Sequence, residues 1–316
     1  MRFDFCPGWG VFLLTVLNVS LLLFSLAMNL VSCAVIRNDF CKKRVKNNAD
    51  LYLFNAVSAL VSLVCFLVLG AVQKTLMLPT LYTLGMGAVF GAATAFCAVL
   101  SMKALESGPL SYTNVIVFCS MVIPSLSGLV MYGEPVSVSQ YVGIGLMLLS
   151  FVFAVDRDRG NTGASLRWLL LCLGAFICNG AVGVLQKVHQ NSPDRAYSVP
   201  FLSVAFAVYA VISGALFLWY RQKKEQPLTV WAAGKRRTFS VYALITGFGV
   251  AVCNAVNLYL AGAMPAVIFF PVFNGAAMLL TSVIGLVFFK EKLTKKQWIG
   301  LFLGSAAILL LCNILR

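Results

Sequence analysis

The segment MYGEPVSVSQYVGIGLML at residues 131–148 returns in related form as FFKEKLTKKQWIGLFLGS at residues 288–305. The two segments align at one ungapped offset of 157 residues, about half of the 316-residue chain. The residues that coincide at this offset are Glu134 with Glu291, Gln140 with Gln297, and Gly143 with Gly300. We infer an internal duplication. Duplicated membrane halves are typical of proteins whose binding site lies where the halves meet.

The composition indicates a helical membrane protein. The chain is 60% hydrophobic and 11% charged, with a mean hydropathy of +0.91, and its apolar runs have the length of membrane spans. A formal charge of +14 would suggest a nucleic-acid partner in a soluble domain. Here the basic residues gather in short segments between apolar runs, where membrane topology and anionic lipid explain them. We therefore expect the lipid bilayer as a partner and no nucleic acid.

Ten apolar runs are long enough to cross about 30 Å of hydrocarbon. No charge separates the eighth run from the ninth, but the segment AGAMP at residues 261–265 supplies a break between them. The ten runs lie near residues 11–36, 51–72, 81–102, 110–132, 138–155, 168–185, 197–220, 241–262, 265–289 and 298–315.

The segment DRDRGNTGAS at residues 156–165 divides the runs into two groups of five. Its charged, polar and glycine residues are incompatible with hydrocarbon. We therefore predict a first repeat over residues 1–155, a polar linker over 156–165 and a second repeat over 166–316. An odd number of spans per repeat forces the second copy into the membrane from the opposite side, so the repeats are inverted.

The distribution of basic residues predicts the orientation. In a ten-span topology, the connections after runs 1, 3, 5, 7 and 9 carry 19 of the 24 Lys and Arg residues, which leaves five for the other side. The positive-inside rule places the basic side in the cytoplasm and both termini outside it.

The repeated segment resembles the EamA-type members of the drug/metabolite transporter superfamily. The shared pattern is Gly-Glu-x-x-(Ser/Thr)-x-x-Gln-x-x-Gly near the end of each half, and only Lys290 departs from it, in place of the first glycine. The resemblance implies an all-α integral membrane fold, with ten helices as two inverted five-helix repeats around a central cavity. It also implies a cavity lined by helices 1, 3, 4, 6, 8 and 9, and termini in the cytoplasm, opposite to the charge argument.

Amide and hydroxyl side chains within the runs are the candidates for a binding site, because unpartnered polar groups are costly in a bilayer. For any single Asn, the alternative is a hydrogen bond between neighbouring helices, which contributes about 0.6–2 kcal/mol to packing. The recurrence of amides at corresponding places in the two halves favours a shared cavity for the group. The candidates are Asn29, Tyr112, Asn114, Asn179, Gln186, Asn254, Asn257 and Asn274.

Two lysines near the ends of runs are candidate anchors for a carboxylate or phosphate on the cargo. These are Lys103 and Lys187. The alternative is that each amine reaches out to the membrane interface, and Lys103 also lies three residues from Glu106, at the spacing of a structural pair.

Pro124 and Pro271 lie inside the fourth and ninth runs, where each removes a backbone hydrogen bond. The resulting bends are candidate hinges for alternating access, or static kinks. Glu134 and Glu291 follow their helices and are expected to cap or close a loop. Because no carboxylate lies in the middle of a span, the sequence disfavours coupling through a buried titrating acid.

The sequence and the resemblance together predict a secondary transporter of small metabolites or drugs in the cytoplasmic membrane, working by alternating access as an exporter or exchanger. We expect a small-molecule substrate, a monomer or homodimer, and neither metal nor cofactor. One alternative is an integral membrane enzyme or lipid-modifying factor, although the sequence offers no recognisable catalytic motif. A second alternative is a membrane interaction protein that transports nothing.

Overall fold

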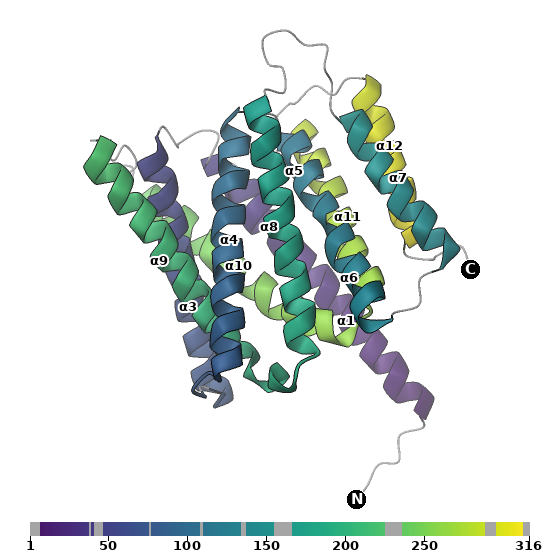
Figure 1. Ribbon diagram of the computed structural model, residues 1–316, viewed down its shortest axis with the longest axis horizontal. Helices are drawn as coiled ribbons and strands as arrows, with labels where there is room; N and C mark the ends of the chain where they lie inside the picture. Colours follow the sequence, from purple (N-terminus) through teal and green to yellow (C-terminus); the bar gives the residue numbers. More distant parts are fainter. Residues whose placement is uncertain are drawn as a thin grey trace, which may run out of the picture.

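The structure is a computed structural model that describes residues 7–37, 39–40, 47–75, 77–107, 110–133, 137–154, 166–224, 236–287 and 295–311 (Figure 1). Regular structure in these residues is helical throughout. The predicted linker, residues 156–165, lies outside them, so the predicted repeat boundaries stay a prediction. The elements of the first half are α1 (Pro7–Asn29), the π-helix η1 (Leu30–Arg37), α3 (Asn48–Gln73), α4 (Leu81–Ser107), α5 (Leu110–Phe118), the 3-10 turn η2 (Cys119–Met121), α6 (Val122–Tyr132) and α7 (Val138–Ala154). The elements of the second half are α8 (Leu166–Gln190), the 3-10 turn η3 (Pro193–Tyr197), α9 (Ser198–Lys224), α10 (Arg236–Ala263), α11 (Ala266–Val287) and α12 (Lys295–Leu311).

Seven helical segments in the described part are long and apolar enough to cross a membrane. Three further apolar segments are shorter, at Ile116–Tyr132, Val138–Met147 and Trp298–Ala307. The seven long segments are Val16–Arg37, Asn48–Gln73, Leu81–Ser107, Arg167–Gln190, Pro193–Gln222, Arg236–Ala263 and Ala266–Gly285.

The helices pack into one bundle in which partners come from distant parts of the sequence. α3 packs along α9, and α7 packs along α12 at the edge that also holds the C-terminus (Figure 1). α4 contacts α8 and α9, α10 contacts α1 and α3, and α11 contacts α5 and α6. Gly91 brings α4 very close to α9, since a Cβ at this position would lie 2.1 Å from the carbonyl oxygen of Ala205. Small residues let helix backbones approach closely in a bilayer.

The fourth run, residues 110–132, is helical throughout, but the 3-10 turn η2 separates α5 from α6. Pro124 has no backbone N–H to donate to the carbonyl of Ser120, which lies four residues earlier. The Ser125 hydroxyl donates to the Met121 carbonyl at 2.7 Å, next to the break. The tighter turn is thus a local response to the proline.

The first span also departs from a regular α-helix. From Leu30 to Arg37 it is a π-helix, a wider form that hydropathy does not predict and that is frequent at functional sites. The Ser32 hydroxyl donates to the Met28 carbonyl just where the helix widens. Opposite it, a Cβ on Gly249 of α10 would lie only 2.3 Å from Ser32 Cβ, so η1 rests directly on α10.

The sixth run ends later than residue 185, because α8 continues to Gln190. The additional turn carries Lys187, which is 5% exposed, and His189, which is fully buried. The His189 ring stacks on Phe201 with 4.1 Å between centroids. Both side chains are therefore packed inside the bundle.

The repeated motif forms a helix start in its first copy. The backbone N–H of Ser137 donates to Gln140 Oε1 at 2.8 Å, and the N–H of Gln140 donates to Ser137 Oγ at 3.3 Å. This reciprocal pair is a capping box that closes the N-terminus of α7. Gly143 and Gly300 are both buried. Glu134, Glu291 and the side chain of Gln297 lie outside the described part of the structure.

Candidate functional site

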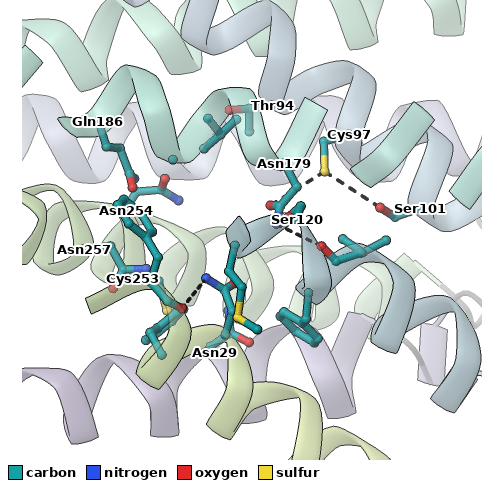
Figure 2. A pocket seen from close by; sticks show the side chains of 18 of the residues that line it. Asn29, Thr94, Cys97, Ser101, Ser120, Asn179, Gln186, Cys253, Asn254 and Asn257 are labelled. Atoms are coloured by element: carbon teal, nitrogen blue, oxygen red, sulfur yellow. Dashed lines mark hydrogen bonds between the residues drawn. The ribbon is translucent and has the colours of Figure 1, made fainter. Parts of the chain in front are cut away.

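A cavity of about 220 Å³ lies between the helices, and amide side chains dominate its polar lining (Figure 2). α1, η1, α4, α5, η2, α6, α8, α9, α10 and α11 all contribute to it. Seven of the eight uncharged side chains predicted from the sequence line this cavity. They are Asn29, Asn114, Asn179, Gln186, Asn254, Asn257 and Asn274.

Asn179 of α8 occupies the side of the cavity where α4, α5 and η2 meet. Its Nδ2 donates to Ser120 Oγ at 2.7 Å and to the Val117 carbonyl at 3.4 Å. The Cys97 sulfur lies 4.0 Å from Asn179 Oδ1 and 3.9 Å from Ser101 Oγ, and dashed lines mark both contacts in Figure 2. Asn179 therefore has the helix-linking role that was the alternative to cargo binding, while it also lines the cavity.

Asn257 links α10 to α1 on the opposite side of the cavity. Its Oδ1 accepts a hydrogen bond of 2.7 Å from Ser25, which is fully buried. Cys253, one turn earlier on α10, contacts the Ser25 carbonyl through its sulfur at 3.4 Å. These contacts fix the amide face of α10 toward the cavity.

Among the described residues, the Nδ2 groups of Asn254 and Asn274 bond within their own helices. Each donates to the carbonyl four residues earlier on its own helix, at 2.9 Å to Val250 and 3.0 Å to Phe270. A side chain folded back in this way satisfies its donor locally. Both residues line the cavity, so helix linking does not account for their presence there.

Asn114 Nδ2 of α5 and Thr281 Oγ1 of α11 are buried polar atoms of lining residues, and neither has a hydrogen-bond partner among the described residues. Leaving a buried donor or acceptor unsatisfied costs about 1–3 kcal/mol. A native protein accepts this cost where water or a ligand supplies the missing partner.

Four phenylalanines form part of the apolar lining. Phe118 of α5 lines the cavity together with Phe269, Phe270 and Phe273 of α11, and it packs against the same hydrophobic cluster as these three. Binding sites for small molecules combine such apolar walls with a few placed polar groups. The lining therefore suits a small molecule with an apolar body and hydrogen-bonding groups.

Arg37, the last residue of η1, is the only formally charged side chain among the described residues that line the cavity. The sequence reasoning missed it, because the residue follows the expected end of the first run and was counted with the basic connection. The wider η1 turn continues the helix through this position. Thr281 and Cys97 were also missed, since hydroxyl and thiol groups in spans are common and carry little signal.

The two predicted lysines are not among the described lining residues of the cavity. Lys103 Nζ lies 5.5 Å from the ring centroid of Tyr52 and 5.8 Å from that of Tyr220, a cation–π arrangement. Lys187 Nζ donates to the carbonyl of Met264 at 3.2 Å. Hydropathy locates a lysine along a helix but not the direction in which its stem points.

The two prolines differ in position. Pro124 lines the cavity, where it packs against Gly183 of α8. Pro271 lies within α11, which continues without interruption, and it is not among the lining residues described. The side chain of Tyr112 lies outside the described part of the structure.

Comparison with known proteins places these features in a family. The sequence profile of the EamA-like transporter family matches residues 21–155 and 166–313, most of the chain. The chain belongs to this family. EamA-like proteins are membrane transporters, and together with the long apolar helices this membership makes the chain a multi-pass membrane protein.

Two individual proteins are similar to this EamA-like chain. A protein of Haemophilus influenzae described as uncharacterized is 20% identical over 211 residues, which cover 66% of this chain and 69% of that protein. A protein known from a crystal structure superimposes with a TM-score of 0.64 at 15% identity, over 96% of this chain and 98% of the other. The second likeness shows a shared fold.

Proposed function

We propose that this EamA-like protein is a secondary transporter that moves small metabolites or drugs across the cytoplasmic membrane by alternating access. The proposal rests on one observation above all. Seven amide side chains from both halves of the chain line one cavity, and Asn114 Nδ2 and Thr281 Oγ1 lack partners there among the described residues. Polar groups at this depth are costly in a membrane, and a cargo with matching hydrogen-bonding groups offsets that cost.

We also propose that the fold is a pair of inverted five-helix repeats, with α7 ending one half and α8 beginning the other. Helix contacts support this arrangement. When each helix is replaced by its counterpart in the other half, the contact of α4 with α8 becomes that of α10 with α1. The contact of α4 with α9 becomes that of α10 with α3 in the same way. All four contacts are present in the structure. The pairs α3 with α9 and α7 with α12 convert into themselves. Such exchange is expected for two repeats related by a pseudo-two-fold axis.

We propose that contacts between second-half helices close one end of the cavity in this state. Lys187 of α8 donates to Met264 in the break between α10 and α11. Next to it, Gln190 packs so closely on Gly262 that a Cβ there would lie 2.9 Å from Gln190 Oε1. Thr281 lies fifteen residues along α11 from Ala266, which corresponds to roughly 22 Å at 1.5 Å per residue. Because Thr281 lines the cavity, the lining extends along α11 away from the Lys187 end. This is the arrangement expected for a cavity that is closed at the Lys187 end.

The charge distribution supports an orientation for this state. Lys103 near the end of α4 and the basic residues at the end of α9 belong to the proposed cytoplasmic side, as does Arg37, whereas the Lys187 end lies on the opposite side. On this basis the described state is closed toward the outside, and both termini are extracytoplasmic. We keep the monomer or homodimer as a prediction.

Coupling follows from the chemistry of the lining. Among its described residues no Asp or Glu occurs. We therefore propose facilitated diffusion or exchange as the transport mode, without a proton carried by a cavity carboxylate. A membrane enzyme or lipid-modifying factor remains the competing hypothesis, and membership of a transporter family favours transport over it.

Flux into proteoliposomes tests the proposed function. Purified protein is reconstituted and loaded with a pool of amino acids, nucleosides, sugars and organic ions, and counterflow of each labelled metabolite is measured. We expect saturable, selective flux that the double variant Asn254→Leu/Asn274→Leu reduces at least tenfold. The matched control is Asn18→Leu, which removes an amide of α1 that is not among the described lining residues. Flux no greater than that of empty liposomes across the whole panel would overturn the proposal.

A further inference from the structure

Two asparagines of α10 present opposite hydrogen-bonding atoms at the cavity. The carbonyl of Val250 can only accept, so the Asn254 atom that bonds it at 2.9 Å is Nδ2, which leaves Oδ1 without a described partner. Asn257 accepts the hydrogen bond from Ser25 through its Oδ1, which leaves its Nδ2 instead. Both asparagines line the cavity, and their spacing of three residues puts them on one face of α10. One turn of this helix therefore offers an acceptor and a donor side by side.

Asn274 of α11 adds a second acceptor. Its Nδ2 donates to the Phe270 carbonyl at 3.0 Å, so Oδ1 is again the atom without a described partner. Two such oxygens disfavour a carboxylate, which has no proton to donate to them. Arg37 also lines the cavity, but it has an interaction partner of its own and is not a free guanidinium. An organic cation finds no Asp or Glu among the described lining residues, so the lining favours an uncharged polar group.

Asn29 of α1 extends the hydrogen-bonding surface of α10. The two helices run antiparallel, since Cys253 contacts the carbonyl of Ser25 whereas Gly249 lies against Ser32. Asn29 lies between the two α1 positions and is therefore level with the α10 turn that precedes the asparagine pair. It lines the cavity and makes no side-chain hydrogen bond with a described residue, so both its donor and its acceptor are available.

Gln186 of α8 provides a further unengaged amide. α8 and α10 end side by side, because Gln190 packs against Gly262. Gln186, one turn before Gln190, is therefore close to the level of Asn257, and Figure 2 shows it on the same side of the view as the two α10 asparagines. It lines the cavity, is only 5% exposed, and bonds no other described side chain or carbonyl. A buried amide in this condition requires water or a ligand as its partner.

We propose that the cargo is an uncharged small molecule whose polar end is an amide-like group, with an N–H donor beside a carbonyl acceptor. Its N–H donates to Asn254 Oδ1 and its carbonyl accepts from Asn257 Nδ2, while the phenylalanines of α5 and α11 contact its apolar body. Asparagine and glutamine amides recognise adjacent donors and acceptors in this two-point manner. This assignment rests on the proposed transport function and specifies its substrate class. The cavity volume of about 220 Å³ limits the cargo to a small molecule.

Matched series of probes test the chemistry of the polar end. Each series shares one body, phenyl, indolyl or short alkyl, and carries a primary carboxamide, an N,N-dimethylcarboxamide, a carboxylate or an aminomethyl group. Binding to the purified full-length protein in detergent is measured by thermal stabilisation over a concentration series. We expect at least one primary carboxamide to act at a concentration at least tenfold below those of its three counterparts. The dimethylated amide is the sharpest comparison, because it is neutral and keeps the acceptor but has no N–H donor.

The proposal would be overturned if, in every series, a charged probe or the dimethylated amide bound as well as the primary carboxamide. Absence of binding by all the probes would overturn it too.

Variants identify the residues that discriminate. Asn254→Leu is expected to remove the tenfold advantage of the primary carboxamide, and Gln186→Leu to reduce it at least threefold. Asn18→Leu, which removes an amide that is not among the described lining residues, is expected to leave it unchanged. Gln186→Leu breaks no hydrogen bond to a described residue, so it decides the question if Asn254→Leu fails to fold. An undiminished advantage in the folded variants would overturn the assignment.

The flux assay separates this proposal from the proposed function. Selective transport of charged metabolites alone would refute the amide-recognising site and retain the transporter. Binding of the primary carboxamides without flux of any metabolite would retain the binding site and refute the transporter.

Discussion

Replacing Gly91 with alanine tests the packing that positions α4 at the cavity. A Cβ on this residue would lie 2.1 Å from the Ala205 carbonyl oxygen, 2.9 Å from its carbonyl carbon and 3.0 Å from its Cα. These are backbone atoms of α9, so no side-chain rotation relieves the clash and the helices must separate by roughly 1 Å to reach ordinary contact. Overpacking of this kind costs about 1–3 kcal/mol.

Gly85→Ala is the matched control, on the same helix but with open space around the position, where a Cβ meets nothing within 4 Å. There the substitution stabilises the helix by about 0.5–1 kcal/mol. The two variants should therefore differ by about 1.5–4 kcal/mol in the free energy of unfolding, measured by titrating SDS into mixed micelles. Because Thr94 and Cys97 follow Gly91 on α4, Gly91→Ala should also weaken cargo binding. Equal stabilities for the two alanine variants would refute the close α4–α9 contact.

Two further substitutions test the contacts that close the Lys187 end of the cavity and the hydrogen bond between Asn179 and Ser120. Lys187→Met removes a charge-assisted hydrogen bond to Met264, and a loss of about 1.5–3 kcal/mol raises opening at that end roughly ten- to hundredfold. This opening is measured as the rate at which a reagent added on the proposed outer side alkylates the cavity cysteines. Lys103→Met should leave this rate unchanged. Asn179→Leu should destabilise the protein by about 0.6–2 kcal/mol, measured by the same SDS titration, and Ser120→Ala should add little to it, because one hydrogen bond joins the two residues. Fully additive costs would contradict that bond.

Amide residues that line the cavity could be selected from the sequence, because a polar side chain inside a membrane span is costly unless it has a partner. An amide in a span needs a partner or a polar cavity, so its presence in a long apolar run indicates one or the other. The sequence could not distinguish an amide that bonds a neighbouring helix from one that lines a polar cavity. Asn179 and Asn257 prove to have helix-linking bonds as well as a place in the lining, whereas Asn254 and Asn274 fold back on their own helices.

The charged residues show what a one-dimensional pattern lacks. Lys103 and Lys187 occupy ends of runs much as Arg37 does, yet only Arg37 is among the described lining residues. The difference is the direction in which each helix face points, which depends on the rotation of the helix and on its length. The π-helical geometry of η1 changes both the rotation and the length of this segment, and the hydropathy of the sequence does not predict that change.

Local backbone chemistry explains the other departures from expectation. The 3-10 turn before Pro124 follows from a missing donor, and a proline inside a run is a visible signal that the prediction used only for a bend. α8 extends past the expected end because Lys187 and His189 find partners inside the bundle, at Met264 and Phe201. Such partners come from distant segments, so local sequence does not reveal them.

The central claim, that cargo occupies the amide-lined cavity, is tested most directly by protection of native cysteines. Cys97 and Cys253 line the cavity, while Cys65 and Cys172 are not among its described lining residues. Conversion of each thiol to a mixed disulfide by a small membrane-permeant thiosulfonate is followed by mass spectrometry in proteoliposomes, with and without a saturating transported metabolite. We predict that the metabolite slows modification of Cys97 and Cys253 at least tenfold and leaves Cys65 unchanged. Unaltered rates at Cys97 and Cys253 during active transport would contradict the claim.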